Sequence, residues 1–171
     1  MTTPPLPDDL FLIHPGGSAD GPTQTTLSFR RSPTVLLNFA ANRFTRIAAR
    51  QYQEQFGIGA MDWRMLVMLT REPGSSVAHA SRTIGIDKAA VSRSLARLDK
   101  AGLVAARVEG SDERRKEWTL TKEGQRMHKE ILAVALERQK QLLSGFSAEE
   151  VQAFTGYLAR FLENLDQLGD G

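Results

Sequence analysis

The sequence predicts a mainly α-helical domain that carries one small β-hairpin. Apolar residues recur at helical spacing through most of the chain that follows residue 31. Two short strand-like runs flank a polar turn between residues 103 and 121. A chain of 171 residues with 41% apolar content can bury one sizeable core. The three observations favour a single, mainly helical domain over residues 32–171.

Residues 1–31 are expected to form a flexible arm in front of this domain. They hold five of the seven prolines and several glycines, a composition that argues against packed structure. The arm also has an apolar island, Leu10 to Ile13. The island can dock on the body of the protein or belong to an untethered tail, and the composition favours the tail.

The first helix of the domain is expected from Ser32 to about Phe56, with Ser32 as cap and Pro33 at the first helical position. Three arginines are spaced along it and either form a solvated face or line a pocket; they are Arg43, Arg46 and Arg50. One face of this helix is apolar and is expected to meet a core: Leu36, Phe39, Ala40, Phe44, Ile47 and Ala48. A second helix, 60–71, is so rich in apolar residues that it should lie inside.

The stretch from Asp87 to Gly102 is typical of a helix that enters a DNA groove. Asp87 can cap its first turn, and Gly102 can end it. An apolar stripe marks the buried face: Val91, Leu95 and Leu98. The opposite face is small, hydroxylated and basic: Ala89, Ser92, Arg93, Ala96 and Arg97. Such a face suits the major groove, whose base edges accept hydrogen bonds from arginine and serine.

The neighbours of this helix strengthen the DNA interpretation. A short helical run, 78–84, and a turn at Gly85 precede it, so the two helices make a helix-turn-helix. Two strands, near 103–109 and 117–121, follow it on either side of a polar, mostly basic tip, 110–116. Taken alone, the helix-turn-helix pattern would also be explained by an ordinary pair of packed helices that does not bind DNA. A wing with a basic tip directly after it favours a DNA-binding module.

These motifs resemble the MarR family of bacterial winged-helix regulators, over about Ser32 to Leu168. The recognition segment from Asp87 to Arg93, followed by Leu98 and by 102–104, is similar to the family. The wing matches the family pattern Asp-x-Arg-x-x-x-apolar-x-Leu-Thr-x-x-Gly at Asp112, Arg114, Trp118, Leu120, Thr121 and Gly124. Two positions depart from it: Gly59 replaces a Ser or Thr cap, and Trp118 is unusually bulky.

The terminal helices are expected to form a dimer. A long helix from Lys122 to about Gly145 is followed by a capping box at Ser147 and Glu150. The last helix has a 3-4-3-4 apolar seam: Val151, Phe154, Leu158, Phe161 and Leu165. The seam can cover the core of its own domain, but a partner chain explains it better. The resemblance implies the same: an obligate homodimer built by helices 32–56 and 122–168 around a DNA-binding lobe, 60–121.

Charge distribution and missing motifs narrow the function. The net charge is only +2, yet residues 82–126 hold 11 basic and 7 acidic side chains, whereas 147–171 hold one and five. Cysteine is absent, and no apolar stretch approaches a membrane span. His14, His79 and His128 are scattered, and no metal cluster, phosphate loop or catalytic motif is found. We therefore expect a cytoplasmic protein without membrane contact, cofactor, metal or enzymatic activity.

The predicted function is a homodimeric transcriptional regulator, a repressor of a pseudo-palindromic double-stranded DNA operator. The DNA contacts are expected from the recognition helix and the wing: Lys88, Ala89, Ser92, Arg93, Arg97, Asp112, Arg114 and Arg115. Arg114 would enter a minor groove, and Asp112 would orient the wing arginines. The alternative is a winged-helix module that binds protein and has no specific DNA site, although such a module has no need for these arginines.

A small-molecule effector is expected to release the operator. The resemblance implies an effector site between the first, second and fifth helices. Trp63 and Arg64 could match the ring and the charge of an aromatic carboxylate. Phe44 and Met127 are further candidates for this site. The alternative is that Trp63 only packs in the core and that Arg64 points to solvent.

Overall fold

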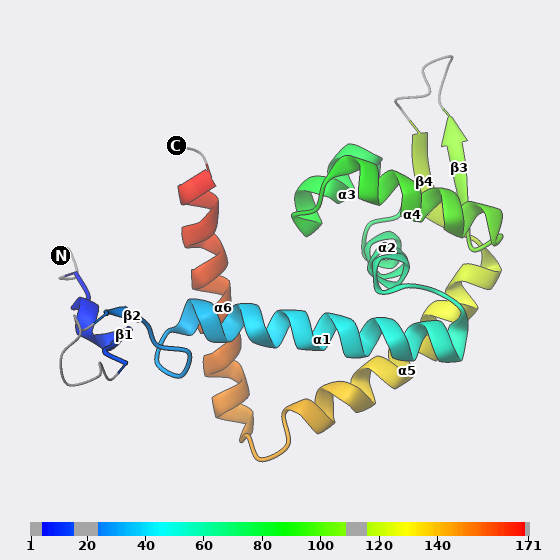
Figure 1. Cartoon of the computed structure of the whole chain (residues 1–171). Helices are drawn as coiled ribbons and strands as arrows, with labels where there is room; N and C mark the ends of the chain where they lie inside the picture. Colours follow the sequence, from blue (N-terminus) through cyan, green and yellow to red (C-terminus); the bar gives the residue numbers. More distant parts are fainter. Residues whose placement is uncertain (1–4, 16–23, 109–115, 170–171) are drawn as a thin grey trace. The chain divides into compact units, whose positions relative to one another are not determined.

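The computed structural model describes residues 5–15, 24–108 and 116–169, and the chain divides into two compact units, Met1–Met65 and Leu66–Gly171. Figure 1 follows the elements along the chain. The first unit contains η1 (Asp8–Leu10), β1 (Leu12–Ile13), β2 (Thr26–Leu27) and α1 (Pro33–Phe56), and α2 (Ala60–Arg71) spans the boundary. The second unit contains α3 (Val77–Ile84), α4 (Lys88–Lys100), β3 (Val104–Val108), β4 (Lys116–Leu120), α5 (Lys122–Leu142) and α6 (Ala148–Gly169). The predicted fold class, mainly helical with a small antiparallel strand pair, is confirmed.

Part of the N-terminal arm has regular structure that its composition did not suggest. β1 and β2 pair antiparallel, with Leu12 opposite Leu27, and the amide of Ser28 donates to the carbonyl of Phe11 over 2.7 Å. The Phe29 ring meets the Phe39 ring of α1 edge-on, with centroids 5.1 Å apart. The apolar island thus contributes to a two-stranded ladder. The flexibility of the arm stays a prediction.

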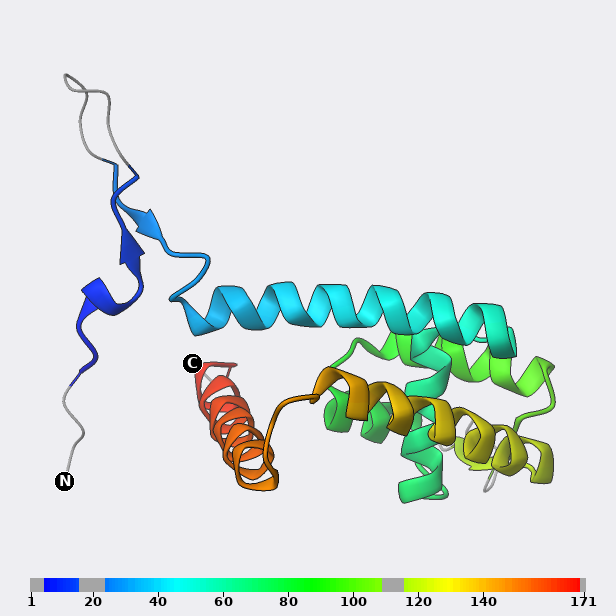
Figure 2. The same cartoon turned by 90° about the horizontal axis from the view of Figure 1, so that it is seen from below.

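Helix α1 is one long uninterrupted helix (Figure 2). Pro33 occupies its first turn as predicted, but the Ser32 hydroxyl does not cap it and instead hydrogen-bonds the Thr34 hydroxyl at 3.1 Å. The expected apolar face is only partly buried: Ala48 is buried, whereas Leu36, Phe44 and Ile47 are 45%, 45% and 49% exposed. The burial expected of this face is therefore confirmed at Ala48 and wrong at Leu36, Phe44 and Ile47. Arg43, Arg46 and Arg50 are exposed, as the solvated-face alternative expects.

Helix α2 begins without the hydroxyl cap that the family usually has. Gly59 takes that position, and its amide donates to the Asp62 carboxylate, 3.1 Å away. The first helical bond runs from the Trp63 amide to the Gly59 carbonyl. Asp62 therefore supplies the returning half of a capping box, so the missing hydroxyl is compensated by the third helical residue.

The second unit is built around the inner face of the helix-turn-helix. The predicted stripe of α4 is confirmed, since Val91, Leu95 and Leu98 are at most 1% exposed. The partners that complete the core come from the other elements of the unit: Leu66, Met68, Leu69, Ala80, Leu103, Val104, Trp118 and Ile131. Within the described ranges, no helix combines the length and the apolar content that crossing a bilayer requires.

The strands β3 and β4 pair in antiparallel register, with Ala106 opposite Trp118. The sheet is extended by the loop after α2, because the Trp118 amide donates to the Ser75 carbonyl and the Trp118 carbonyl accepts from the Gly74 amide. These bonds measure 3.1 and 2.9 Å. The bulky Trp118 is buried, with 8% of its surface exposed, at the point where the strand pair meets this loop.

The start of α5 lies directly against the end of α4. The Thr121 hydroxyl donates to the Gly102 carbonyl over 2.7 Å and accepts from the Gly124 amide over 3.0 Å. A Cβ atom at Gly124 would lie 1.9 Å from the carbonyl oxygen of Leu103. Only glycine fits this approach of two backbones. The capping box predicted for α6 is also present, with Ser147 and Glu150 bonded in both directions.

Replacement of Gly124 by alanine should therefore destabilise the protein by about 1–3 kcal/mol, because backbone atoms must move to admit the new methyl group. A thermal melt would report a lower Tm, by roughly 2–4 °C for each kcal/mol in a chain of this size. Gly156→Ala is the matched control, since a Cβ at this α6 position meets nothing within 4 Å. An unchanged Tm for Gly124→Ala would contradict the described junction.

Candidate nucleic-acid interface

The outer face of α4 presents the polar and basic side chains that the sequence predicted. Lys88, Ala89, Ser92, Arg93 and Arg97 are all exposed, and Ala96 adds a small residue between them. The inner face of the same helix is buried in the core of the second unit. The outer face of α4 therefore carries no large apolar group, and the packing of its inner face against the core fixes the helix in place.

The turn before α4 is fixed by side-chain hydrogen bonds to the backbone. Asp87 caps the helix, as predicted, by accepting from the Ala90 amide over 2.9 Å. The Ser81 hydroxyl donates to the Ile86 carbonyl over 2.6 Å, and Gly85 takes the left-handed conformation at φ 72°. Because the turn is restrained on both sides, the first turn of α4 has one defined direction relative to α3.

Helix α3 is fastened to the end of α2 by a charged contact. His79 Nε2 lies 2.5 Å from the Glu72 carboxylate, and Arg71 is 3.3 Å from the same group. The hydrogen bond to His79 is the main reason that the pKa of Glu72 is lowered from its usual value. His79 thus links α3 to the residue that follows α2. Among the described residues, no group of histidine, aspartate and glutamate is arranged to hold a metal.

The wing tip cannot be compared with its prediction, because Asp112, Arg114 and Arg115 lie outside the described residues. Residues beside the tip that the sequence analysis did not select are placed by the strands: Arg107 on β3 is exposed, and Lys116 on β4 is half-buried. The alternation of inward and outward side chains along β3 could have identified Arg107 as an exposed basic residue. Residues of α4 and β4, among them Ser92, Lys100 and Lys116, line a hollow of about 480 Å³.

The comparisons with known proteins agree with this architecture. A family model described as the MarR family matches residues 56–115. The chain is 29% identical over 125 residues to YwoH of Bacillus subtilis (strain 168), an uncharacterized HTH-type transcriptional regulator; the match covers 71% of this chain and 90% of YwoH. It is 30% identical to a MarR/EmrR family transcriptional regulator from Acinetobacter sp. ADP1, whose crystal structure matches with a TM-score of 0.76 over 82% of this chain and 99% of that one. The chain belongs to the MarR family.

Two other MarR-like structures share the fold at lower identity. S. aureus MepR in complex with DNA is 22% identical, with a TM-score of 0.68 over 81% of this chain and 99% of that one. PcaV from Streptomyces coelicolor in complex with its natural ligand is 21% identical, with a TM-score of 0.67 over 81% and 96%. Membership in the family makes the chain a transcriptional regulator and not an enzyme, in agreement with the sequence analysis.

The residues expected to bind the MarR-type effector are divided between the two units. Phe44, Trp63 and Arg64 belong to the first unit, and Met127 on α5 belongs to the second. Trp63 is half-buried and packs against Tyr52, with ring centroids 5.9 Å apart. This contact favours the packing alternative for Trp63, whereas Arg64 is half-buried rather than directed wholly to solvent.

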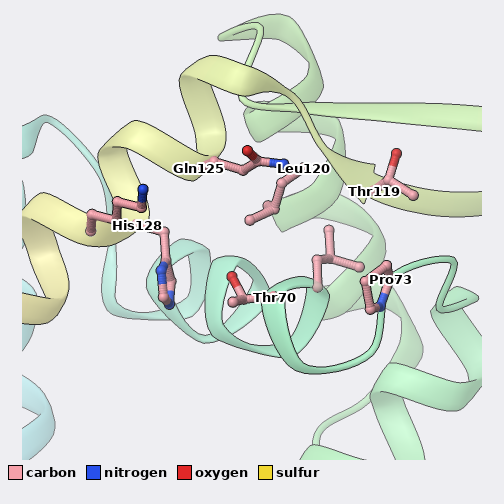
Figure 3. A pocket seen from close by; sticks show the side chains of 8 residues that line it. Thr70, Pro73, Thr119, Leu120, Gln125 and His128 are labelled. Atoms are coloured by element: carbon pink, nitrogen blue, oxygen red, sulfur yellow. The ribbon is translucent and has the colours of Figure 1, made fainter.

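A separate hollow of about 300 Å³ lies at the surface of the second unit, between α2, β4 and α5 (Figure 3), and most of the residues that line it are exposed. Its lining comes from two stretches of the chain: Leu69, Thr70, Pro73, Thr119, Leu120, Gln125, His128 and Lys129. Sequence reasoning missed this hollow. The two stretches that line it, 69–73 and 119–129, are more than 40 positions apart in the sequence, so only the tertiary structure brings them together.

Loss of the Asp87 cap should loosen the recognition helix. Asp87→Ala removes the acceptor for the Ala90 amide and should lower the free energy of unfolding by about 1 kcal/mol. Urea or thermal unfolding followed by circular dichroism measures the loss. Asp99→Ala is the control, because this exposed acid lies in the last turn of α4, where a negative charge is unfavourable. Equal losses in both variants would show that Asp87 has no specific capping role.

Proposed function

We propose that this MarR-family chain is a homodimeric repressor that places α4 of each protomer in a major groove of its operator. The observation that carries the proposal is the two-sided character of α4. Its apolar stripe is at most 1% exposed, while Ser92, Arg93 and Arg97 face outward. Arginine can donate two hydrogen bonds to guanine, and serine can contact bases or phosphates.

The wing is proposed to make the second contact. Arg114 would enter the neighbouring minor groove, where a narrow A·T-rich segment concentrates negative potential. Asp112 would orient the wing arginines through ion pairs, and Arg115 would add charge toward the phosphates. MepR, which has the same fold, is known in a complex with DNA, and this supports DNA as the partner of the present chain. Exposed Arg107 on β3 extends the basic surface toward the wing.

The exposed apolar side chains support a homodimer. On α6, Phe154 and Leu165 are each 46% exposed, Leu162 is 61% exposed and Tyr157 is 62% exposed. Together with Leu36, Phe44 and Ile47 of α1, they leave more apolar side chains exposed than a monomer normally tolerates. A second copy of the chain would cover these faces. Two-fold symmetry would then set the half-sites about one helical turn apart.

A small-molecule effector is proposed to release the operator. The complex of PcaV with its natural ligand supports a ligand-responsive member of this fold. An aromatic acid at Trp63 and Arg64, with Phe44 and Met127 nearby, remains the prediction from sequence. Such a ligand can act only if it binds one spacing of the two DNA-binding lobes better than the other.

The function is tested by replacing Arg93. Arg93→Ala should weaken binding to the operator by about 1–3 kcal/mol if the guanidinium reads a base. If it holds a phosphate, binding to operator and random duplexes should fall together, and the salt slope should shrink by about 1. Mobility shifts on both duplexes at several salt concentrations separate these cases.

The control for this experiment is Lys140→Ala, which removes one positive charge from an exposed position on α5. It should leave both affinities nearly unchanged. If Arg93→Ala also leaves both affinities unchanged, α4 does not contact DNA through this residue and the proposed orientation fails. Protein partners in place of DNA would be indicated if the unmodified chain binds no duplex from its own upstream region.

A further inference from the structure

We propose that the N-terminal arm of one protomer docks on α6 of the partner subunit. The docking surface on the arm, called the arm base, consists of Leu27, Phe29, Arg30 and Arg31, all of them exposed. The inference rests on the proposed homodimer and adds to it a contact made by residues that precede α1.

Hydrogen bonds hold the arm base against the start of α1. The Ser28 hydroxyl accepts from the amides of Arg30 and Arg31, over 3.3 and 3.1 Å. The Ser32 amide donates to the Ser28 carbonyl over 3.1 Å, and the Arg31 guanidinium donates to the carbonyl of Leu12 on β1. The arm base is therefore fixed at the N-terminal end of α1 (Figure 2).

The apolar side chains of the arm base have little cover in the described parts of their own chain. Leu27 is 45% exposed, and Phe29 is 65% exposed although its ring meets the Phe39 ring. A ladder of two short strands is not stable by itself in water and needs apolar packing against a further element. Leu36, in the first turns of α1, belongs to the face that the proposed homodimer covers. A second copy of the chain can therefore cover the arm base as well.

Charge complementarity selects α6 as the surface on which the arm base docks. The stretch 21–53 holds five arginines and no acidic residue, and Arg30 and Arg31 belong to it. Among the helices that the structure describes, α6 alone has a net negative charge, with one basic residue against four acids: Arg160 against Glu149, Glu150, Glu163 and Asp166. Opposite charges attract the arm base to α6, whereas the other helices repel it.

The exposed apolar seam of α6 has an acid at its edge. Leu162 is 61% exposed and Leu165 is 46% exposed, so both can pack against the apolar side chains of an arm base. Asp166 follows Leu162 by four residues, which makes the two side chains neighbours on the helix surface. In the proposed contact, Leu27 and Phe29 pack on the seam and Arg30 faces Asp166.

Cross-linking of single-cysteine variants tests the contact, because the unmodified chain has no cysteine. Leu27→Cys and Leu162→Cys are purified with tags of different length, mixed until subunits exchange, and treated with a short bismaleimide. A covalent dimer with one chain of each variant is expected. Gln167→Cys in place of Leu162→Cys is the matched control and should give several-fold less of it. At 100° per residue, its side chain falls about 160° from the centre of the seam.

The double variant Leu27→Cys/Leu162→Cys distinguishes a partner subunit from the same chain. The cross-link should join two chains, and circular dichroism melts verify that the variant is folded. A cross-link within one chain, no cross-link at all, or equal yields with Leu162→Cys and Gln167→Cys would each overturn the proposed docking.

Exchange of the charges at the contact gives a second readout. Arg30→Asp should raise the Kd of the dimer in sedimentation by at least about threefold, because an exposed ion pair is lost at two symmetric places. Addition of Asp166→Arg to Arg30→Asp should restore the Kd nearly to that of the unmodified chain. Glu163→Arg, on the side of α6 away from the seam, should not restore it. If both second substitutions act alike, Arg30 does not face Asp166.

Sedimentation of the unmodified chain separates this inference from the proposed function. A dimer that gives no cross-link between the arm base and α6 would refute the docking of the arm and leave the homodimer supported. A monomer would refute the homodimer and, with it, the docking of the arm on a partner subunit.

Discussion

The backbone contact between Leu103 and the start of α5 determines the geometry of the DNA-binding unit. The Leu103 carbonyl accepts from the Thr121 amide over 3.1 Å, and the Leu103 amide donates to the Leu98 carbonyl over 2.9 Å. Gly124 lies so close to the same carbonyl that no side chain fits. One point therefore joins the end of α4, the start of β3, the end of β4 and the start of α5. In this chain, the Leu-Thr-x-x-Gly pattern at Leu120, Thr121 and Gly124 has this packing requirement as its physical reason.

The recognition helix and the wing strands are consequently supported by the same core. Helix α4 is packed onto the core through Val91, Leu95 and Leu98. The backbone hydrogen bond between Trp118 and Ser75 joins β4 to the loop before α3. Residues placed on such elements are held more precisely than residues on free loops.

Local patterns predicted the features that depend on local physics. The buried stripe of α4, the Asp87 cap and the box at Ser147 and Glu150 each need only neighbouring residues, and each is present. The strands of the N-terminal arm were not predicted, because two-residue strands pair through backbone hydrogen bonds that amino-acid composition does not indicate. The Ser32 cap was wrong because the hydroxyl has a competing partner in Thr34.

Features that depend on distant residues were harder to predict. The apolar pattern identified one face of α1, but it could not tell a core in the same chain from the surface of a second chain. Phe44 and Ile47 are exposed although they follow a regular apolar spacing, as the proposed homodimer expects. The hollow lined by Leu69, Leu120 and His128 was missed for the same reason, since its lining comes from two stretches, 69–73 and 119–129, that are distant in the sequence.

The most direct test of a dimeric DNA-binding regulator is a hydroxyl-radical footprint of the full chain on its own upstream DNA, with sedimentation of the same complex. Two protected patches about one helical turn apart are expected, in a complex that contains two chains on each duplex. A single patch bound by one chain, or uniform protection without a preferred sequence, would contradict the homodimeric repressor.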